Sequence, residues 1–306
     1  MNIPLVNRRR FLHGTMAFAG AGLLAGTARA IDIPDVEMAI TRQAVPSHHI
    51  DDWGMPRTAR QGLHIFRAIP KAPPPPGGYP VIYMLDGNAV FDLLTPEILA
   101  SVPELMIVGV GYQGKKRFAV EARTLDYTPP LFGTTGPTPD PQRPQRLQGG
   151  AAEFFDRLTG PVREVCEKGI AIAPDNRSIW GHSLGGLFVL YALFKHPDSF
   201  ARYIPVSPSL WWGGETYPAL EAEAALRAST PADVLVMLGD MESRSGQPKL
   251  AAPRPAPATI DLIARLGKRK DLVVSQRILE GSQHGPALVR SIPFALNFAA
   301  APARQG

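Results

Sequence analysis

Short apolar runs alternate along the chain with longer segments in which apolar residues recur every three or four positions. The short runs predict strands, and the periodic segments predict helices. The runs expected as strands are Leu63–Ile69, Pro80–Leu85, Leu105–Val110, Arg177–Trp180, Tyr203–Ser207, Val234–Leu238 and Leu272–Leu279. The segments expected as helices are Ala151–Lys168, Leu184–Lys195 and Pro286–Phe298. This alternation predicts an α/β fold with a mostly parallel central sheet flanked by helices.

One long segment departs from the alternation. Residues 113–150 contain few apolar residues, and six prolines stand between Pro129 and Pro144. A connection of this length inside a compact domain is either functional or loosely ordered. It leaves a predicted strand and enters a predicted helix, so we expect a Pro-rich loop over the strand ends, where ligands bind in open α/β sheets.

The first thirty residues have the composition of an export signal. Three arginines at positions 8–10 precede a weakly apolar stretch over Gly14–Gly26, and Ala28-Arg29-Ala30 follows as a small-residue cleavage site. Paired arginines are typical of twin-arginine signals, and the apolar stretch is too short to span a bilayer in the usual way. We therefore predict a signal peptide over 1–30, export by the twin-arginine machinery, and one periplasmic domain over 31–306 without stable membrane insertion. An ordinary Sec signal or an uncleaved anchor is the alternative.

Charge outside the predicted signal is nearly balanced. Of the 32 Lys and Arg residues, four lie in residues 1–30, where there is no Asp or Glu, so 28 basic and 27 acidic residues remain. This balance gives no electrostatic support to nucleic-acid binding. A single cysteine, Cys166, excludes an intrachain disulfide and a cysteine-cluster zinc site. We expect neither a metal nor another cofactor.

The segment Gly181-His182-Ser183-Leu184-Gly185 matches the pattern Gly-x-Ser-x-Gly. It follows a predicted strand and opens a predicted helix, which is the strand–turn–helix setting of a nucleophile elbow. Glycines on both sides let neighbouring backbone pack closely against so sharp a turn, and the first amides of the helix point toward a developing oxyanion. We predict that Ser183 is a nucleophile; a purely structural turn is the alternative.

A serine hydroxyl is a poor nucleophile until a base takes its proton. The histidines after the predicted signal are His48, His49, His64, His182, His196 and His284. Hydrolases with this elbow order their triads as Ser, then Asp or Glu, then His, and only His284 satisfies that order. His182 is the neighbour of Ser183 on the turn and points away from it. We predict His284 as the base, with a solvent-facing loop histidine as the alternative.

Two carboxylates follow the strand expected at Val234–Leu238. Asp240 stands one residue and Glu242 three residues after Gly239, and either can accept the imidazole N–H, fix its tautomer and stabilise the imidazolium. In this fold class the acid often comes three residues after the strand-ending glycine, which favours Glu242, with Asp240 as the alternative. A Ser–His pair without an acid also stays open.

An oxyanion hole needs two backbone amides. The first is expected from Leu184, the residue after the nucleophile. The second is expected from the loop after the strand at Pro80–Leu85, at Gly87 or Asn88, because glycine permits unusual backbone angles there. A plain Asp-Gly turn is the alternative.

Four stretches together resemble the esterase-D-like branch of the α/β hydrolases. They are PVIYMLDGNAVF at 80–91, RTLDYTP at 123–129, WGHSLGGL at 180–187 and SPSLWW at 207–212. The resemblance extends from about Val36 to Phe298 and is greatest to periplasmic enterobactin- and salmochelin-type siderophore esterases. It implies a single α/β-hydrolase domain, with Ser183 as nucleophile and His284 as base.

The resemblance implies a small-molecule ester substrate, a catecholate siderophore such as enterobactin. A ferric tris-catecholate is an aromatic trianion, which favours fixed positive charge and flat apolar walls. Arg123 lies in the family's Arg-x-x-Asp-x-Thr-Pro stretch and is the candidate for the charge; Trp211 and Trp212 are candidates for the walls. A solvated loop and core packing, respectively, are the alternatives.

Three other functions remain open at this point. A general or carbohydrate (feruloyl or acetyl) carboxylesterase would use the same triad on other esters. An acyltransferase would pass the acyl group to a hydroxyl acceptor in place of water. A non-catalytic siderophore-binding protein would bind the ferric catecholate without turnover at Ser183.

Overall fold

The computed structural model describes residues 33–57, 60–141, 143–243 and 250–302. The predicted signal peptide at 1–30 lies outside these residues, and export by the twin-arginine pathway stays a prediction. From Ile33 onward the chain forms one compact unit. Among the described residues, no helix is both long enough and apolar enough to cross a membrane.

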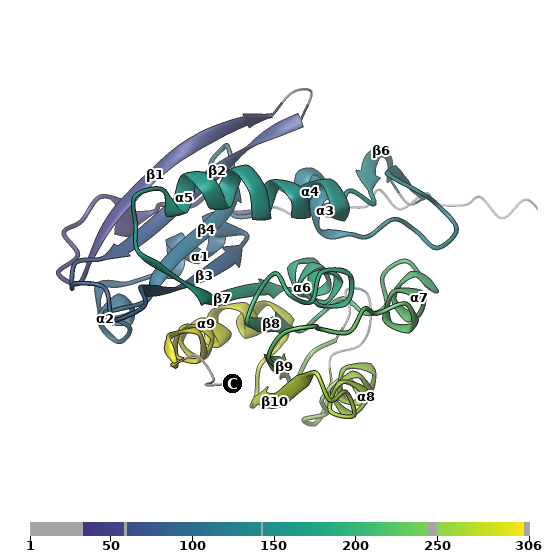
Figure 1. Ribbon diagram of the computed structural model, residues 1–306. Coiled ribbons are helices and arrows are strands. Elements are labelled where there is room, and N and C mark those ends of the chain that lie inside the picture. The colour runs from purple at the N-terminus through teal and green to yellow at the C-terminus, as the bar shows by residue number, and fades with distance from the viewer. Residues whose placement is uncertain (1–32, 58–59, 142, 244–249, 303–306) are drawn as a thin grey trace, which may run out of the picture. The chain divides into compact units, whose positions relative to one another are not determined.

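The described domain is built on one eight-stranded sheet with the strand order β1-β2-β4-β3-β7-β8-β9-β10. Its strands are β1 (His48–Arg57), β2 (Arg60–Pro70), β3 (Tyr79–Leu85), β4 (Met106–Tyr112), β7 (Ile172–His182), β8 (Arg202–Val206), β9 (Ala232–Gly239) and β10 (Leu272–Leu279). The strands from β4 to β10 in this order are parallel, and β1 and β2 extend the sheet antiparallel at one edge. The predicted α/β class is confirmed (Figure 1).

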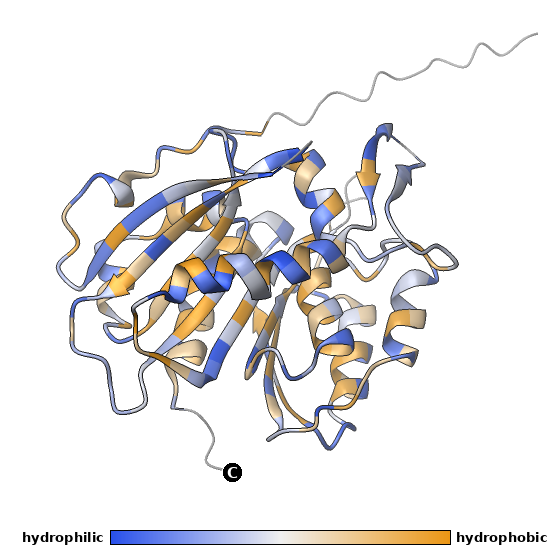
Figure 2. Cartoon of the chain, turned by 45° about the horizontal axis from the view of Figure 1, so that its top comes forward, coloured by the Kyte–Doolittle hydropathy of each residue, from blue (hydrophilic) through white to orange (hydrophobic). Residues whose placement is uncertain are grey.

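Helices cover both faces of the sheet, which explains the strand sequences. They are α1 (Gly87–Leu93), α2 (Pro96–Ala100), α3 (Val120–Tyr127), α4 (Ala151–Arg157), α5 (Arg163–Glu167), α6 (Leu184–Lys195), α7 (Thr216–Ala222), α8 (Pro257–Leu266) and α9 (His284–Ala300), with short helical turns η1 (Ala39–Thr41) and η2 (Leu158–Val162). Every residue of β3, β4 and β8 is buried. Parallel strands covered on both faces read as continuous apolar runs, and Figure 2 shows these hydrophobic residues along the central strands.

Two apolar cores lie on opposite faces of the sheet. One holds residues of α4, α6 and α8, and the other holds residues of α1, α2 and α9. The helix expected over 151–168 is interrupted by the π-turn η2, because Gly160 leaves helical backbone angles and Pro161 follows it. Helix α6 begins and ends at the predicted residues, Leu184 and Lys195.

The segment expected as a long loop, 113–150, is partly regular. It contains α3, and it also contains a small hairpin of β5 (Thr138–Asp140) with β6 (Arg143–Gln148). Thr124, Asp126 and Tyr127 of α3 are buried, which the low apolar content did not predict. The segment predicted as a Pro-rich loop therefore includes regular elements at α3 and at the β5–β6 hairpin.

Candidate active site

Ser183 occupies a sharp turn between β7 and α6, at the carboxyl edge of the parallel strands. Its backbone has φ 61° and ψ −117°, a conformation that residues other than glycine rarely adopt. A Cβ on Gly181 would come within 2.4 Å of the Gly185 carbonyl oxygen, so only glycine fits at this position near the end of β7. The Ser183 amide donates to the Val206 carbonyl of β8 at 3.0 Å. The turn is thus held between two strands, and it presents the serine hydroxyl above the sheet, as a nucleophile elbow requires.

His284 is the first residue of α9, in the chain segment that follows the edge strand β10, and its side chain reaches Ser183. Its Nδ1 lies 2.8 Å from Oε2 of Glu242, and its Nε2 lies 3.0 Å from Oγ of Ser183. A carboxylate can only accept, so Nδ1 carries the proton and Nε2 is left as an acceptor for the serine hydroxyl. The structure brings the predicted nucleophile and base into direct hydrogen-bond contact.

Glu242 lies three residues after the glycine that ends β9, and its carboxylate is fully engaged. Besides the bond to His284, its Oε1 accepts from the Gly239 amide at 2.6 Å and from the Ser207 hydroxyl at 2.5 Å. Its side chain is mostly buried. Asp240 makes no side-chain contact with His284; its backbone carbonyl accepts from the Arg254 amide at 2.6 Å. Of the two predicted acids, Glu242 is the one that reaches the histidine.

The expected oxyanion donors lie at two adjacent helix starts. Leu184 is the first residue of α6, and its amide has no acceptor in the described part of the chain. Gly87 and Asn88 open α1, and the Asn88 side chain is held by Tyr112 through two hydrogen bonds to its backbone, at 2.8 and 3.0 Å. A Cβ on Gly185 would lie 3.6 Å from Leu85, so the end of β3 packs against the start of α6. The roles of these amides stay predictions.

His182 helps to position His284, a role that sequence reasoning missed. Its Nε2–H donates to the His284 backbone carbonyl at 2.9 Å, and the two rings lie 4.6 Å apart. Burial, and then the neighbouring His284 and Arg123, hold the pKa of His182 well below its usual value. His182 therefore stays neutral and fixes the first residue of α9, which carries the base.

The Ser-Pro-Ser turn after β8 contributes two further hydroxyls that sequence reasoning did not assign. Ser207, at φ 43°, donates to Glu242, and the Ser209 hydroxyl lies 3.2 Å from that of Ser183. Small hydroxyl residues are common in turns, so only the three-dimensional contacts distinguish these two from ordinary turn residues.

A pocket of about 610 Å³ opens directly onto Ser183 and His284. Its wall includes Trp211, of which 55% is exposed, whereas Trp212 is only 8% exposed and packs in the core. Trp211 is thus placed to contact a ligand and Trp212 is not, which corrects the prediction for Trp212. No described residue of 113–150 lines this pocket, so the expected Pro-rich loop does not form its wall.

Arg123 is not on the wall of this pocket either. Its guanidinium makes two hydrogen bonds of 2.8 Å to the carboxylate of Asp86, which is almost completely buried, and it lies over the rings of Phe118 and Tyr127. Burial lowers the pKa of Arg123, but the Asp86 carboxylate outweighs this and raises it overall. The charge of Arg123 is therefore balanced within the protein, which corrects its assignment as the group that attracts an anionic substrate. Among the described residues that line the pocket, the one Lys or Arg is Arg254, which is exposed and has no side-chain partner in the described part of the chain.

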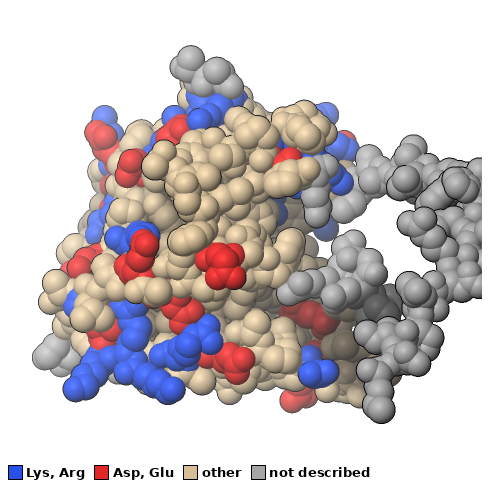
Figure 3. Space-filling view, turned by 90° about the vertical axis from the view of Figure 1, so that its right-hand side faces the viewer, with Lys and Arg blue, Asp and Glu red and all other residues tan. Residues whose placement is uncertain are grey.

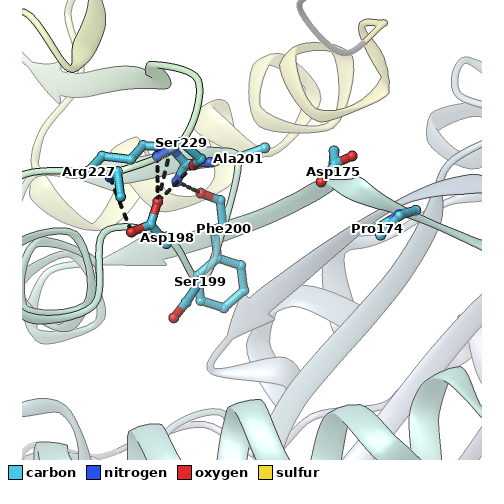
Figure 4. A pocket seen from close by; sticks show the side chains of 9 residues that line it. Pro174, Asp175, Asp198, Ser199, Phe200, Ala201, Arg227 and Ser229 are labelled. Atoms are coloured by element: carbon cyan, nitrogen blue, oxygen red, sulfur yellow. Dashed lines mark hydrogen bonds and ion pairs between the residues drawn. The ribbon is translucent and has the colours of Figure 1, made fainter. Parts of the chain in front are cut away.

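A second hollow, of about 380 Å³, lies between the turn before β8 and the segment before β9 (Figure 4). Its polar groups bind one another: Arg227 donates to the Phe200 carbonyl at 2.6 Å, and Asp198 accepts from the Ser229 hydroxyl at 2.7 Å. No cluster of three or more His, Cys, Asp or Glu residues suited to a metal occurs among the described residues. The triad pocket is therefore the site whose geometry supports chemistry.

Comparisons with known proteins identify the family of this chain. A protein-family model described as "Putative esterase" matches residues 60–259. The ferri-bacillibactin esterase BesA of Bacillus subtilis is 36% identical over 61% of this chain and 63% of its own length. The apo-salmochelin esterase of Escherichia coli is 38% identical over 51% of this chain and 48% of its own length. The matches thus span less than two thirds of these curated relatives.

Solved structures match a larger share of this chain than the curated relatives do. The enterobactin and salmochelin hydrolase IroE superposes with a TM-score of 0.70 at 27% identity, covering 86% of this chain and 100% of that one. The BES protein from Bacillus cereus gives a TM-score of 0.69 at 27% identity, covering 85% and 99%. Because the family model matches well over half of the sequence, the chain belongs to this esterase family.

Proposed function

We propose that this protein is a serine hydrolase that cleaves carboxylic esters through an acyl-enzyme. The observation that carries the proposal is the continuous hydrogen-bond chain from Glu242 through His284 to Ser183, which ends at a pocket open to solvent. The nucleophile, base and orienting acid lie at the distances that such catalysis needs.

The reaction follows from the hydrogen bonds. His284 Nε2 takes the hydroxyl proton as Ser183 Oγ attacks the ester carbonyl carbon, and the amides proposed at Leu184 and at Gly87 or Asn88 bind the tetrahedral oxyanion. His284 then gives the proton to the leaving alkoxide. A water molecule, deprotonated by the same nitrogen, attacks the acyl carbon, and Ser183 leaves with the returned proton. Glu242 keeps the imidazole in the correct tautomer throughout and does not itself take a proton.

We further propose that the substrate is an ester-linked catecholate siderophore. The names of the relatives point to siderophore esters, and the pocket has matching chemistry: an exposed indole at Trp211, and a guanidinium at Arg254 that has no partner among the described residues. On the face shown in Figure 3, acidic side chains lie among the basic ones, so this face offers no broad basic surface to a negatively charged substrate.

Product analysis on a matched panel tests the substrate. We expect cyclic catecholate trilactones, enterobactin and bacillibactin, to be opened to linear catechoyl esters with a higher kcat/KM than feruloyl esters or 4-nitrophenyl acetate. Mass spectrometry of timed reactions, with iron-free and with ferric ligand, ranks the substrates by kcat/KM. Preferred turnover of feruloyl esters would favour a carbohydrate esterase, and transfer to an added alcohol ahead of water would favour an acyltransferase. Ferric-ligand binding without any turnover would contradict the enzyme assignment.

Replacing Arg254 by Ala should separate charged from neutral substrates. Losing the cation is expected to lower kcat/KM about three- to tenfold for an anionic ester, 4-nitrophenyl hemisuccinate, because an exposed charge contact contributes modestly. The neutral 4-nitrophenyl butyrate should change less than about twofold. The difference should shrink at high ionic strength, since salt screens an exposed charge.

Two variants control this measurement. Arg254→Lys keeps the charge and should retain most of the preference. Lys268→Ala removes a positive charge from an exposed position outside the pocket and should leave both substrates unaffected. Equal losses of kcat/KM for both esters in Arg254→Ala would show that the residue shapes the pocket and does not bind the charge of the substrate.

A further inference from the structure

Ser209 is placed against the reacting oxygen itself. Its hydroxyl lies 3.2 Å from Oγ of Ser183, and this is its sole hydrogen-bond contact within the described part of the chain. The residue is 2% exposed and lines the triad pocket. Buried polar groups are normally paired, and the partner of this hydroxyl is the nucleophile itself, so its hydrogen bond bears directly on the reacting oxygen.

The direction of this hydrogen bond follows from counting protons. Ser183 has one hydroxyl proton, and it points at Nε2 of His284, because Nδ1 holds the ring's own proton against Glu242. Ser183 Oγ can therefore only accept from Ser209. The Ser209 hydroxyl is the donor, and it approaches the nucleophile from a side that His284 does not occupy.

The backbone holds Ser209 in this position before any substrate arrives. Its amide donates to the Ser183 carbonyl at 3.2 Å, and its own carbonyl accepts from the Trp212 amide at 3.0 Å. A Cβ on Gly186 would lie 2.8 Å from the Val206 carbonyl oxygen and 3.1 Å from Cα of Pro208, so the Ser-Pro-Ser turn packs directly on the start of α6. A donor fixed in this way costs little to reorganise during the reaction.

We propose that Ser209 is a further catalytic residue, which donates a hydrogen bond to Ser183 Oγ when that oxygen leaves the acyl-enzyme. The proposal rests on the proposed function, with Ser183 as nucleophile. In deacylation, hydroxide formed by proton transfer from water to His284 attacks the acyl carbon. The C–Oγ bond then breaks, its electron pair goes to Oγ, and the proton on His284 passes to the same oxygen. Ser209 keeps its own proton and stabilises the charge that builds on Oγ.

The two half-reactions should depend differently on this donor. Before acylation, Oγ belongs to a hydroxyl, which already accepts a good hydrogen bond, so the bond to Ser209 strengthens little on the way to the transition state. In the acyl-enzyme, Oγ is the single-bonded oxygen of an ester and a weak acceptor, so the bond strengthens as the oxygen leaves. Only interactions that are stronger in the transition state than in the ground state accelerate a step. Deacylation therefore gains more from Ser209 than acylation does.

Pre-steady-state kinetics of Ser209→Ala with 4-nitrophenyl acetate test this asymmetry. We expect deacylation to slow about tenfold, the size of one hydrogen bond, while acylation changes less than about threefold. The variant should show a burst of nitrophenolate, and intact-mass spectrometry should show the protein 42 Da heavier at steady state, about the mass of one acetyl group. Ser209→Thr keeps a hydroxyl and should restore deacylation. Ser209→Cys keeps the size with a weaker donor and should lie between, which provides a second readout should the alanine variant lose stability.

The outcomes separate this inference from the proposed function. Equal slowing of both half-reactions would make Ser209 a residue that only positions the turn, and unchanged rates in both would remove its role. Either result overturns the inference while leaving the assignment of the nucleophile intact, since that rests on labelling Ser183. Loss of the proposed function itself would appear as turnover that does not need Ser183.

Discussion

Replacing Ser183 by Ala is expected to lower kcat on carboxylic esters by about 10⁶-fold, to the residual rate that binding and the oxyanion donors supply on their own. The hydroxyl is the atom to which His284 is aligned, at 3.0 Å, and no other hydroxyl or thiol among the described residues bonds to Nε2 of His284. Ser209 is the nearest hydroxyl, but it contacts Ser183 and makes no bond to His284 in the described residues. It therefore cannot be activated as a substitute without movement of the turn.

The measurement pairs steady-state kinetics with covalent labelling. A fluorophosphonate probe should modify the wild-type protein at Ser183, and Ser183→Ala should remain unlabelled while keeping its thermal unfolding midpoint close to that of the wild type. Ser183→Gly is a useful companion, because glycine adopts the positive φ of this turn without strain and should be inactive yet no less stable. Activity of the alanine variant within tenfold of the wild type, or an adduct at another residue, would contradict the assignment.

The nucleophile and the base could be predicted from sequence because their signals are local. Gly181 is required by its contact with the Gly185 backbone four residues later, and the elbow needs only a strand before it and a helix after it. His284 followed from chain order. For Ser183 the residues that create the geometry are its neighbours in sequence, whereas the partners of His284, Glu242 and His182, are distant and appear only in the folded chain.

The substrate-binding residues were harder to predict because their partners are distant in sequence. Arg123 had the right charge, but its counter-ion Asp86 is 37 residues away, and only the folded chain brings the two together. Trp211 and Trp212 are adjacent and equally hydrophobic, yet one faces the pocket and the other the core. Arg254, in a stretch rich in Ala and Pro, carried no pattern that set it apart from a solvated surface residue.

The fold was predicted best where strands are buried on both faces. The central strands are continuous apolar runs, whereas β1 was missed because it lies at an antiparallel edge and alternates polar and partly buried residues, with His49, Asp51 and Asp52 exposed. Edge strands carry few apolar residues, since one side of the ladder and much of one face meet water. Helix α3 was missed for a different reason, because it buries polar residues. The buried charge of Asp126 is balanced by Arg57 of β1 at 2.6 Å, a partner that is distant in sequence.

Replacing Glu242 by Gln should reduce kcat by about 10³- to 10⁴-fold with little change in KM, and the structure gives the reason. The Gly239 amide and the Ser207 hydroxyl both donate to one oxygen of Glu242, so the amide of Gln should turn its oxygen toward them. Its NH₂ group then faces Nδ1 of His284. Two donors cannot share that contact, so the ring is driven to the tautomer with its proton on Nε2, which cannot accept the serine proton.

Asp240→Asn is the matched control for this prediction, because Asp240 stands two residues away on the same loop, whereas among the described residues the carboxylate that bonds to His284 is that of Glu242. We expect it to keep kcat within about threefold. Single-turnover kinetics of both variants, alongside thermal unfolding, separate a loss of chemistry from a loss of folding. Retention of kcat within a few-fold in Glu242→Gln would mean that Ser183 and His284 work as a pair, and that Glu242 serves only to anchor the loop after β9. A large loss in Asp240→Asn together with a small one in Glu242→Gln would reassign the acid, and would require the two side chains to exchange places around His284 when substrate binds.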